Sequence, residues 1–215
     1  MASSSKLIIL VTGANCGIGF STMQALSLRY LDGTYIIGCR AISPGQQAIQ
    51  KLRELGVKAN LDVVELDVTS DSTIETARNW VREKYGRLDV LVNNAGIALF
   101  PSSSSPTAIR ENFNTTFNTN ITSLYTMTQA FLPLLHLSPA PKVINISSGR
   151  ASLTRSSDGK LPPTKVKMED ALVGEERGKG EVEFFAANPG YCKTAFNGFR
   201  GTKDPLDGAE VVVRL

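Results

Sequence analysis

The sequence is poor in the residues that build metal sites and disulfide frameworks. It contains one histidine and three widely spaced cysteines, Cys16, Cys39 and Cys192. Because no pair of these cysteines has the spacing of metal ligands, we expect no bound metal. An odd number of cysteines and the lack of a recognisable signal peptide favour a reducing compartment, so we expect a cytoplasmic protein.

Charge of one sign and long apolar runs are also scarce. The formal net charge is +3 over 215 residues and no basic cluster stands out, so we expect no nucleic-acid partner. No apolar run approaches the roughly 20 residues that cross a bilayer, so we expect no membrane partner. With 42% hydrophobic and 20% charged residues, the composition is that of a globular domain with a substantial core.

What is present is a regular alternation of short apolar runs and longer amphipathic stretches. Each run holds about four to eight residues, mostly β-branched or apolar, as in strands that are covered on both faces. The predicted strands are residues 7–12, 34–38, 61–66, 88–93, 142–147 and 181–187.

Helices are predicted between these strands: residues 17–31, 44–55, 72–85 and 109–136, and a further helix from about Asp207. For the second helix, Ser43 is the predicted N-cap, Pro44 the first helical residue and Gly56 the stop, and Gly86 is the predicted stop of the third. The long helix is expected to break near residues 114–118. Repeated β–α alternation predicts an α/β fold with a doubly wound parallel sheet of the Rossmann type, in a single domain over residues 1–215.

A glycine-rich turn joins the first predicted strand to the first predicted helix. It reads Thr12-Gly13-Ala14-Asn15-Cys16-Gly17-Ile18-Gly19. Glycines let the backbone turn tightly and approach a diphosphate, while the first N–H groups of the helix and its dipole attract negative charge. In this strand–turn–helix context the pattern predicts a dinucleotide site for NADP(H) or NAD(H).

The spacing Gly-x-x-x-Gly-x-Gly is the first of five ordered motifs. The others are Leu66-Asp67-Val68, Asn93-Asn94-Ala95-Gly96, Asn145-Ile146-Ser147-Ser148, and Pro189-Gly190 followed by Thr194. Together they resemble the short-chain dehydrogenase/reductase family, and within it the members of the carbonyl reductase type. The resemblance implies an oxidoreductase that transfers hydride between NADP(H) and a small-molecule carbonyl or alcohol.

The resemblance also assigns residues to parts of the cofactor. The diphosphate is expected to lie against Gly13, Asn15, Cys16, Gly17, Ile18 and Gly19. The adenine is expected to bind Asp67, although this residue also precedes Thr69 and can instead cap the next helix. The residues expected to shape the adenosine side and steady the sheet are Asn93, Ala95 and Gly96. Those expected to close over the nicotinamide are Pro189, Gly190 and Thr194, ahead of a mobile substrate lid with Phe196 and Phe199.

Arg40 follows the second predicted strand, where an acidic residue would accept hydrogen bonds from a free ribose hydroxyl. A guanidinium suits a 2′-phosphate instead, so we expect NADP, with NAD the less favoured cofactor. The alternative is a surface arginine without a ligand. Against NADP, Cys16 stands where many relatives carry a second basic residue.

The reaction centre of the family is only partly present. Asn120 and Ser148 stand where the family has its water-anchoring asparagine and its carbonyl-orienting serine. None of the five tyrosines lies between Ser148 and Pro189, where the family places a Tyr-x-x-x-Lys pair. Counting from Ser148, Leu161 takes the tyrosine position and Lys165 takes the position of the lysine that binds the ribose.

Two explanations for the missing tyrosine stay open. Leucine has replaced the tyrosine, or residues 162–167 join the two sides of an internal deletion. In both cases we expect very low turnover, because leucine cannot donate a proton. The chain is then a catalytically impaired nucleotide-binding protein or an incomplete isoform.

The remaining expectations concern the last third of the chain. Residues 149–180 are polar and contain many glycines, which predicts irregular structure. The final helix reaches the last residue, whereas relatives continue into another strand, so we expect a truncated C-terminal end. Because many relatives dimerise through the long helix, a homo-oligomer is a further option.

Overall fold

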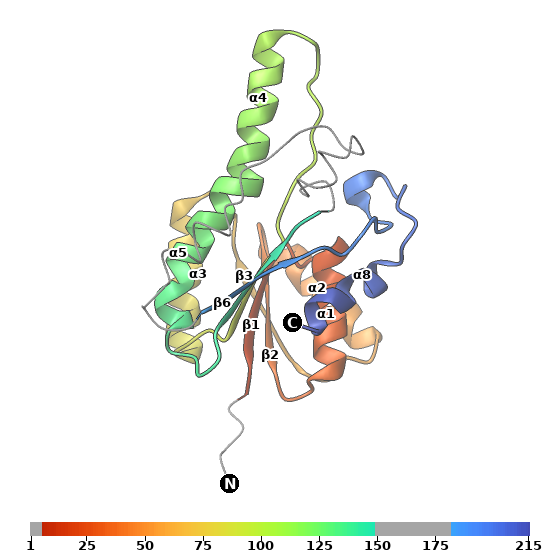
Figure 1. Ribbon diagram of the computed structural model, residues 1–215. Helices are drawn as coiled ribbons and strands as arrows, with labels where there is room; N and C mark the ends of the chain where they lie inside the picture. The colour runs from red at the N-terminus through yellow and green to blue at the C-terminus, as the bar shows by residue number, and fades with distance from the viewer. Residues whose placement is uncertain (1–5, 149–181) are drawn as a thin grey trace.

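The structure, a computed structural model, describes residues 6–148 and 182–215. These residues form one six-stranded sheet in the order β3-β2-β1-β4-β5-β6, in which every neighbouring pair is parallel (Figure 1). The strands are β1 Ile8–Thr12, β2 Thr34–Cys39, β3 Asn60–Glu65, β4 Val90–Asn93, β5 Lys142–Ile146 and β6 Glu183–Ala187. The predicted α/β fold with a doubly wound parallel sheet is therefore confirmed, and each predicted strand is found within two residues of its expected bounds.

Helices cover both faces of the sheet, which explains why β1 and β2 are buried along their whole length. On one face lie α1 Gly17–Arg29, α2 Ile42–Glu54 and α8 Pro205–Val213. On the other lie α3 Asp71–Tyr85 and α5 Ser123–Leu135. Successive residues of β1 belong to hydrophobic cores on opposite faces of the sheet. Ile9 packs with the first group of helices and Leu10 with the second.

One predicted helix start is wrong and two predicted stops are confirmed. Helix α2 begins at Ile42 after the N-cap Ala41, so Ser43 is inside the first turn and does not cap it. Pro44 is tolerated there because the N–H groups of the first turn have no helical acceptor. The chain leaves α2 through Gly56 (φ +87°) and α3 through Gly86 (φ +76°), in the left-handed conformation that glycine favours.

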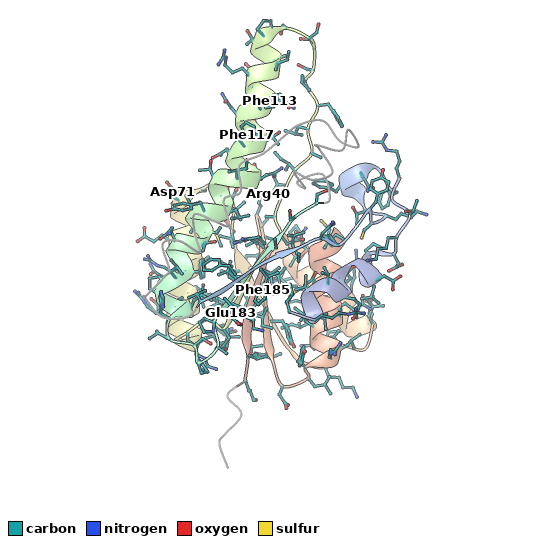
Figure 2. All side chains as sticks on the ribbon, in the orientation of Figure 1. Arg40, Asp71, Phe113, Phe117, Glu183 and Phe185 are labelled. Carbon is teal, nitrogen blue, oxygen red and sulfur yellow. The ribbon has the colours of Figure 1, made fainter. Side chains whose placement is uncertain are left out.

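The long helix is continuous but contains an irregular segment. Helix α4 spans Pro106–Phe117, a π-helical turn η1 spans Asn118–Thr122, and α5 follows at Ser123. The break predicted near residues 114–118 is therefore wrong, because the helix continues through them and only widens into the π-helical turn at residues 118–122. Helix α4 stands clear of the sheet, has no buried residue, and presents the rings of Phe113 and Phe117, which meet edge to face (Figures 1 and 2).

The strand order reverses at the centre of the sheet. From β1 the chain proceeds outwards to β2 and β3, and it then returns to β4 on the other side of β1. In doubly wound sheets ligands bind at this reversal. Within the described parts of the chain, no helix is long and apolar enough to cross a membrane.

At the opposite edge of the sheet, where the strands begin, a buried carboxylate joins several segments. Asp89 is 1% exposed. It accepts hydrogen bonds from Ile8 N (2.8 Å), Arg87 Nε (2.9 Å) and Ser138 Oγ (2.5 Å). These contacts join β1, the start of β4 and the loop before β5.

We expect Asp89→Ala to lower the free energy of unfolding by about 3 kcal/mol, because it leaves three donors without their charged acceptor. Urea unfolding followed by circular dichroism measures the change. Ser138→Ala is the matched control, since it removes one neutral donor and costs about 1 kcal/mol. A loss in Asp89→Ala no larger than that of the control would contradict this account.

Candidate nucleotide-binding site

The turn between β1 and α1 leaves a row of backbone donors at the carboxyl edge. Gly13 and Gly17 adopt φ of +64° and +58°, and Gly13 N donates to Gly38 O at 2.8 Å. The N-cap Cys16 makes no side-chain capping bond, and the first helical bond runs from Phe20 N to Cys16 O. Among the described residues, nothing accepts from the N–H groups of residues 17–19.

Space is left in front of these donors. A Cβ built on Gly17 would meet no described atom closer than Thr194 Cβ, at 3.9 Å. Three unpaired N–H groups at a helix N-terminus and an open approach fit a diphosphate. The predicted turn residues therefore fit a dinucleotide cofactor. Of the others in this turn, Asn15 is half-buried and Cys16 exposed, while Ile18 lies in the first turn of α1.

Asn94, which the sequence motif contains but which we did not single out, connects the turn to β4. Its Nδ2 donates to Thr12 O at 2.8 Å, and Thr12 Oγ1 accepts from the N–H groups of Asn94 and Ala95, each at 2.9 Å. A Cβ built on Gly19 would lie 2.5 Å from Asn94 Nδ2. Gly19 is therefore required for α1 to approach the β4 loop. In the sequence, the only sign of this role of Asn94 was an asparagine at the end of a predicted strand.

The buried side chain of Asn93 forms hydrogen bonds within the protein. It is 7% exposed, and its Nδ2 donates to Asn145 Oδ1 (2.9 Å) and Thr128 Oγ1 (3.1 Å). These bonds join β4 to β5 and α5. The expectation that this motif steadies the central sheet agrees with this geometry.

Arg40 and Asp67 stand at the carboxyl ends of β2 and β3. Arg40 is exposed and forms no ion pair with any described residue (Figure 2). Asp67 Oδ1 accepts from the hydroxyl (2.7 Å) and N–H (2.9 Å) of Thr69. These two bonds, and more weakly the charge of Arg40, hold the pKa of Asp67 below its usual range. The Asp67 carboxylate thus shapes the turn before α3 but does not cap that helix, whose N-cap is Ser70.

The segment after β6 reaches across to the start of α1. Thr194 is 6% exposed and contacts the position of Gly17, although the two are far apart in sequence. Gly190 adopts φ of +84° beneath the stem of Lys203, whose Nζ donates to Pro189 O at 3.1 Å. Of the residues predicted to close over the nicotinamide, Thr194 thus lies near the turn between β1 and α1, while Pro189 and Gly190 contact Lys203.

Asn120 holds the loop after β4. Its Oδ1 accepts from Ile97 N and its Nδ2 donates to Ile97 O, both at 2.8 Å. A Cβ built on Gly96 would lie 3.3 Å from Asn120 Oδ1, so glycine permits this approach. The side chain of Asn120 is thus occupied in the π-helical turn.

The other predicted catalytic residues are Ser148 and Lys165. Ser148 is exposed just after β5, at the same edge of the sheet. Lys165 lies outside the described residues, as do Leu161 and the predicted irregular stretch. In the described parts, no group of histidine, cysteine, aspartate and glutamate gathers as a metal site.

A doubly wound parallel sheet with uncapped amides at its reversal point defines a dinucleotide-binding protein of the Rossmann class. More particularly, the model of the short chain dehydrogenase family matches residues 7–204, and the chain belongs to this family of NAD(P)-binding oxidoreductases.

Relatives along the whole chain agree with this assignment. A short-chain dehydrogenase/reductase of Aspergillus fumigatus is 43% identical and aligns with all of this chain and 89% of its own length. Mouse carbonyl reductase [NADPH] 1 is 29% identical over 99% of this chain and 91% of its own. The alcohol dehydrogenase of Thermococcus sibiricus, solved with 5-hydroxy-NADP, has the same fold: TM-score 0.76, 23% identity, 98% of this chain and 92% of that one.

The alignment with the Aspergillus protein also differs in length from this chain. It runs over 235 positions and includes all 215 residues, so the relative has positions without a counterpart here.

Proposed function

We propose that the chain binds NADP(H) at the carboxyl edge of the sheet and acts as an oxidoreductase on a carbonyl or alcohol. The observation that carries the proposal is the row of unpaired N–H groups at residues 17–19, held open beside Thr194. Exposed Arg40 supports NADP over NAD, since it forms no ion pair with a described residue and a 2′-phosphate accepts its hydrogen bonds. The name of the mouse relative supports the same choice.

Titration of the purified chain with NADPH and NADH, followed by nucleotide fluorescence, tests the proposal. We expect saturable binding of both, with NADPH the tighter. A folded sample that binds neither nucleotide would refute it.

Arg40→Gln should weaken NADPH binding by about tenfold and leave NADH binding within about twofold, because only NADPH has the phosphate. The readout is the ratio of the two Kd values. Arg82→Gln is the matched control, since Arg82 is also exposed but lies on α3. An equal loss for both nucleotides would mean that Arg40 supports the fold and does not select the cofactor.

In this proposal, residues of the chain itself orient the substrate, bind the cofactor and support the proton relay. When bound, the nicotinamide supplies or accepts the hydride. Ser148 orients the carbonyl oxygen, Lys165 binds the ribose, and Asn120, held by Ile97, anchors the water of the proton relay. The adenine role of Asp67, a cytoplasmic location and a homo-oligomer belong to the same proposal.

A second candidate function is nucleotide binding with little or no turnover. The observation that favours it is the lack of any tyrosine between Ser148 and Pro189. An alignment longer than the chain is consistent with an internal deletion as its cause. Turnover with a panel of aldehydes and ketones separates the two candidates.

A further inference from the structure

The segment of residues 191–204, here called the lid, is closed at its base by backbone hydrogen bonds. Thr202 N and Lys203 N donate to Tyr191 O at 2.9 and 3.1 Å, and Lys193 N donates to Lys203 O at 2.9 Å. A Cβ on Gly201 would overlap the backbone of Cys192, so only glycine allows the two sides to come this close. The base of the lid is thus tied in a defined conformation.

Phe199 in this lid has a strained backbone. It has φ of +59° and is the only non-glycine residue of the described parts with positive φ. The left-handed conformation is unfavourable for a bulky side chain. Burial does not compensate for it, because the Phe199 ring is 61% exposed. Strain of this kind persists where surrounding contacts enforce it, and it is concentrated at ligand sites.

The contact that enforces the strain leads to the nucleotide site. Phe199 N donates to Thr194 O at 2.8 Å, and Thr194 is a buried residue whose Cβ lies 3.9 Å from where a Cβ on Gly17 would be. The position of the Phe199 ring is therefore coupled to the first turn of α1, where the diphosphate is proposed to bind.

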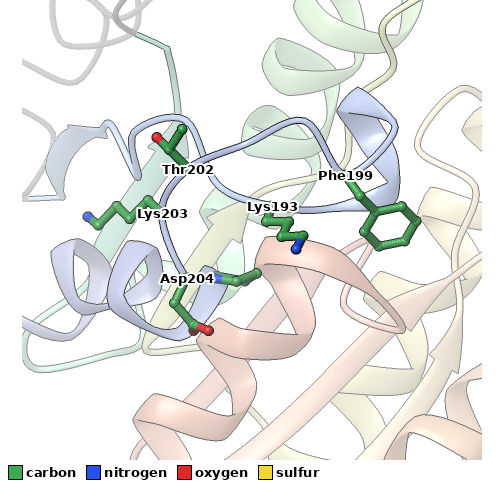
Figure 3. A pocket seen from close by; sticks show the side chains of 6 residues that line it. Lys193, Phe199, Thr202, Lys203 and Asp204 are labelled. Carbon is green, nitrogen blue, oxygen red and sulfur yellow. The ribbon is translucent and has the colours of Figure 1, made fainter.

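The ring lines an open cleft that carries positive charge. The cleft has a volume of about 410 Å³ and is lined by Lys193, Phe199, Thr202, Lys203, Asp204 and Pro205 (Figure 3). Two of its charged groups are engaged elsewhere. Lys203 Nζ donates to Pro189 O at 3.1 Å, and Asp204 Oδ1 caps α8 by accepting from Leu206 N at 2.7 Å.

Lys193 is different. It is exposed and has no ion-pair partner among the described residues. In the view of Figure 3 it lies between Phe199 and Asp204, while Lys203 extends away from them. The cleft therefore offers an uncommitted ammonium group beside an exposed aromatic face.

We infer that this cleft binds an aromatic ring bearing an acid group, with Phe199 stacking on the ring and Lys193 pairing with the acid. The inference rests on the proposed function, since the ligand is then the carbonyl or alcohol substrate. Stacked rings attract through offset contact, and an ammonium pairs with a carboxylate through charge-assisted hydrogen bonds. The substrate class is thus an aromatic carbonyl compound with an acidic substituent.

The test uses two probes with the same ring, 1-naphthoate and 1-naphthalenemethanol, on the NADP-saturated chain. Their own fluorescence reports binding. We expect naphthoate to bind about tenfold more tightly than the alcohol, and Lys193→Gln to remove that difference without affecting the alcohol. Lys58→Gln, at another exposed lysine, should change neither. Equal affinity of the wild type for the two probes, or unchanged naphthoate binding in Lys193→Gln, would overturn the inference.

Phe199→Gly gives a second, independent readout. We expect it to weaken both probes about tenfold while the melting temperature stays equal to or above that of the wild type, because glycine relieves the strain. Phe196→Gly is the matched control: Phe196 is also exposed in the lid but has no positive φ, so its replacement should lower the melting temperature. A melting temperature of Phe199→Gly below that of Phe196→Gly would contradict a strain held for ligand binding.

The ligand assigned to the cleft and the proposed function can be refuted separately. If the wild type binds NADPH but shows no preference for naphthoate, the assignment of the cleft is wrong and the proposed function stands. If it binds naphthoate but neither nucleotide, the proposed function fails, and with it the identification of this ligand as a substrate.

Discussion

Gly19→Val should weaken NADPH binding at least about 100-fold, which corresponds to a loss of about 2.7 kcal/mol. A Cβ at this position would lie 2.5 Å from Asn94 Nδ2, 2.7 Å from Gly13 O and 2.9 Å from Ala14 Cα. Two of these atoms are backbone and cannot move without displacing β1. The first turn of α1 must therefore shift, and the N–H groups of residues 17–19 shift with it.

Fluorescence titration with NADPH measures this loss, and circular dichroism checks that the variant is folded. Gly56→Ala is the control, since Gly56 has φ of +87° and a Cβ there would meet nothing within 4 Å. It should destabilise the chain by about 1 kcal/mol through backbone strain and leave the Kd unchanged. Unaltered NADPH affinity in Gly19→Val would show that the nucleotide does not rest on this turn.

The chain should reduce aldehydes and ketones about 100-fold to 10,000-fold more slowly than a relative that has the tyrosine, which is the usual contribution of a positioned general acid. NADPH oxidation with a panel of carbonyl compounds measures the rate, with mouse carbonyl reductase [NADPH] 1 as the comparison enzyme. A rate equal to that of the comparison enzyme would refute this prediction and the second candidate function.

Leu161→Tyr separates the two explanations of the gap. If leucine has replaced the tyrosine, the variant restores Tyr-x-x-x-Lys with Lys165, and the rate should rise at least about tenfold. If the motif was deleted, the new phenol is not placed beside the carbonyl and the rate should not change. NADPH titration of the variant checks that a null result is not a loss of cofactor binding.

Much of the scaffold could be predicted because its signals are local. Apolar runs predicted all six strands of the sheet, and Gly56 and Gly86 marked helix ends because only glycine adopts their φ without cost. The errors also have local causes. Ser43 is a good capping residue, but α2 starts at Ile42, two residues before the predicted first helical residue Pro44. The asparagine-rich stretch suggested a broken helix, whereas the chain accommodates it in the π-helical turn that carries Asn120.

The site itself was predicted in parts and assembled only by the fold. The motifs identified Thr194 and Asn120. They did not indicate that Thr194 lies near Gly17, or that Asn120 hydrogen-bonds both the N–H and the carbonyl of Ile97. The strain at Phe199 had no signal beyond the neighbouring glycine. Such contacts depend on the exact distance between loops of different strands, which no local pattern encodes.

By itself, the amino-acid order determined a layered parallel sheet with a glycine-rich turn after its first strand, because the spacing of apolar residues and the conformational freedom of glycine act over a few residues. Tertiary structure alone decided which distant groups meet there: Asn94 under Gly19, Thr194 against α1, and Phe199 and Lys193 on one cleft. The physical reason is that parallel strands bring their carboxyl ends to one edge irrespective of their separation along the chain.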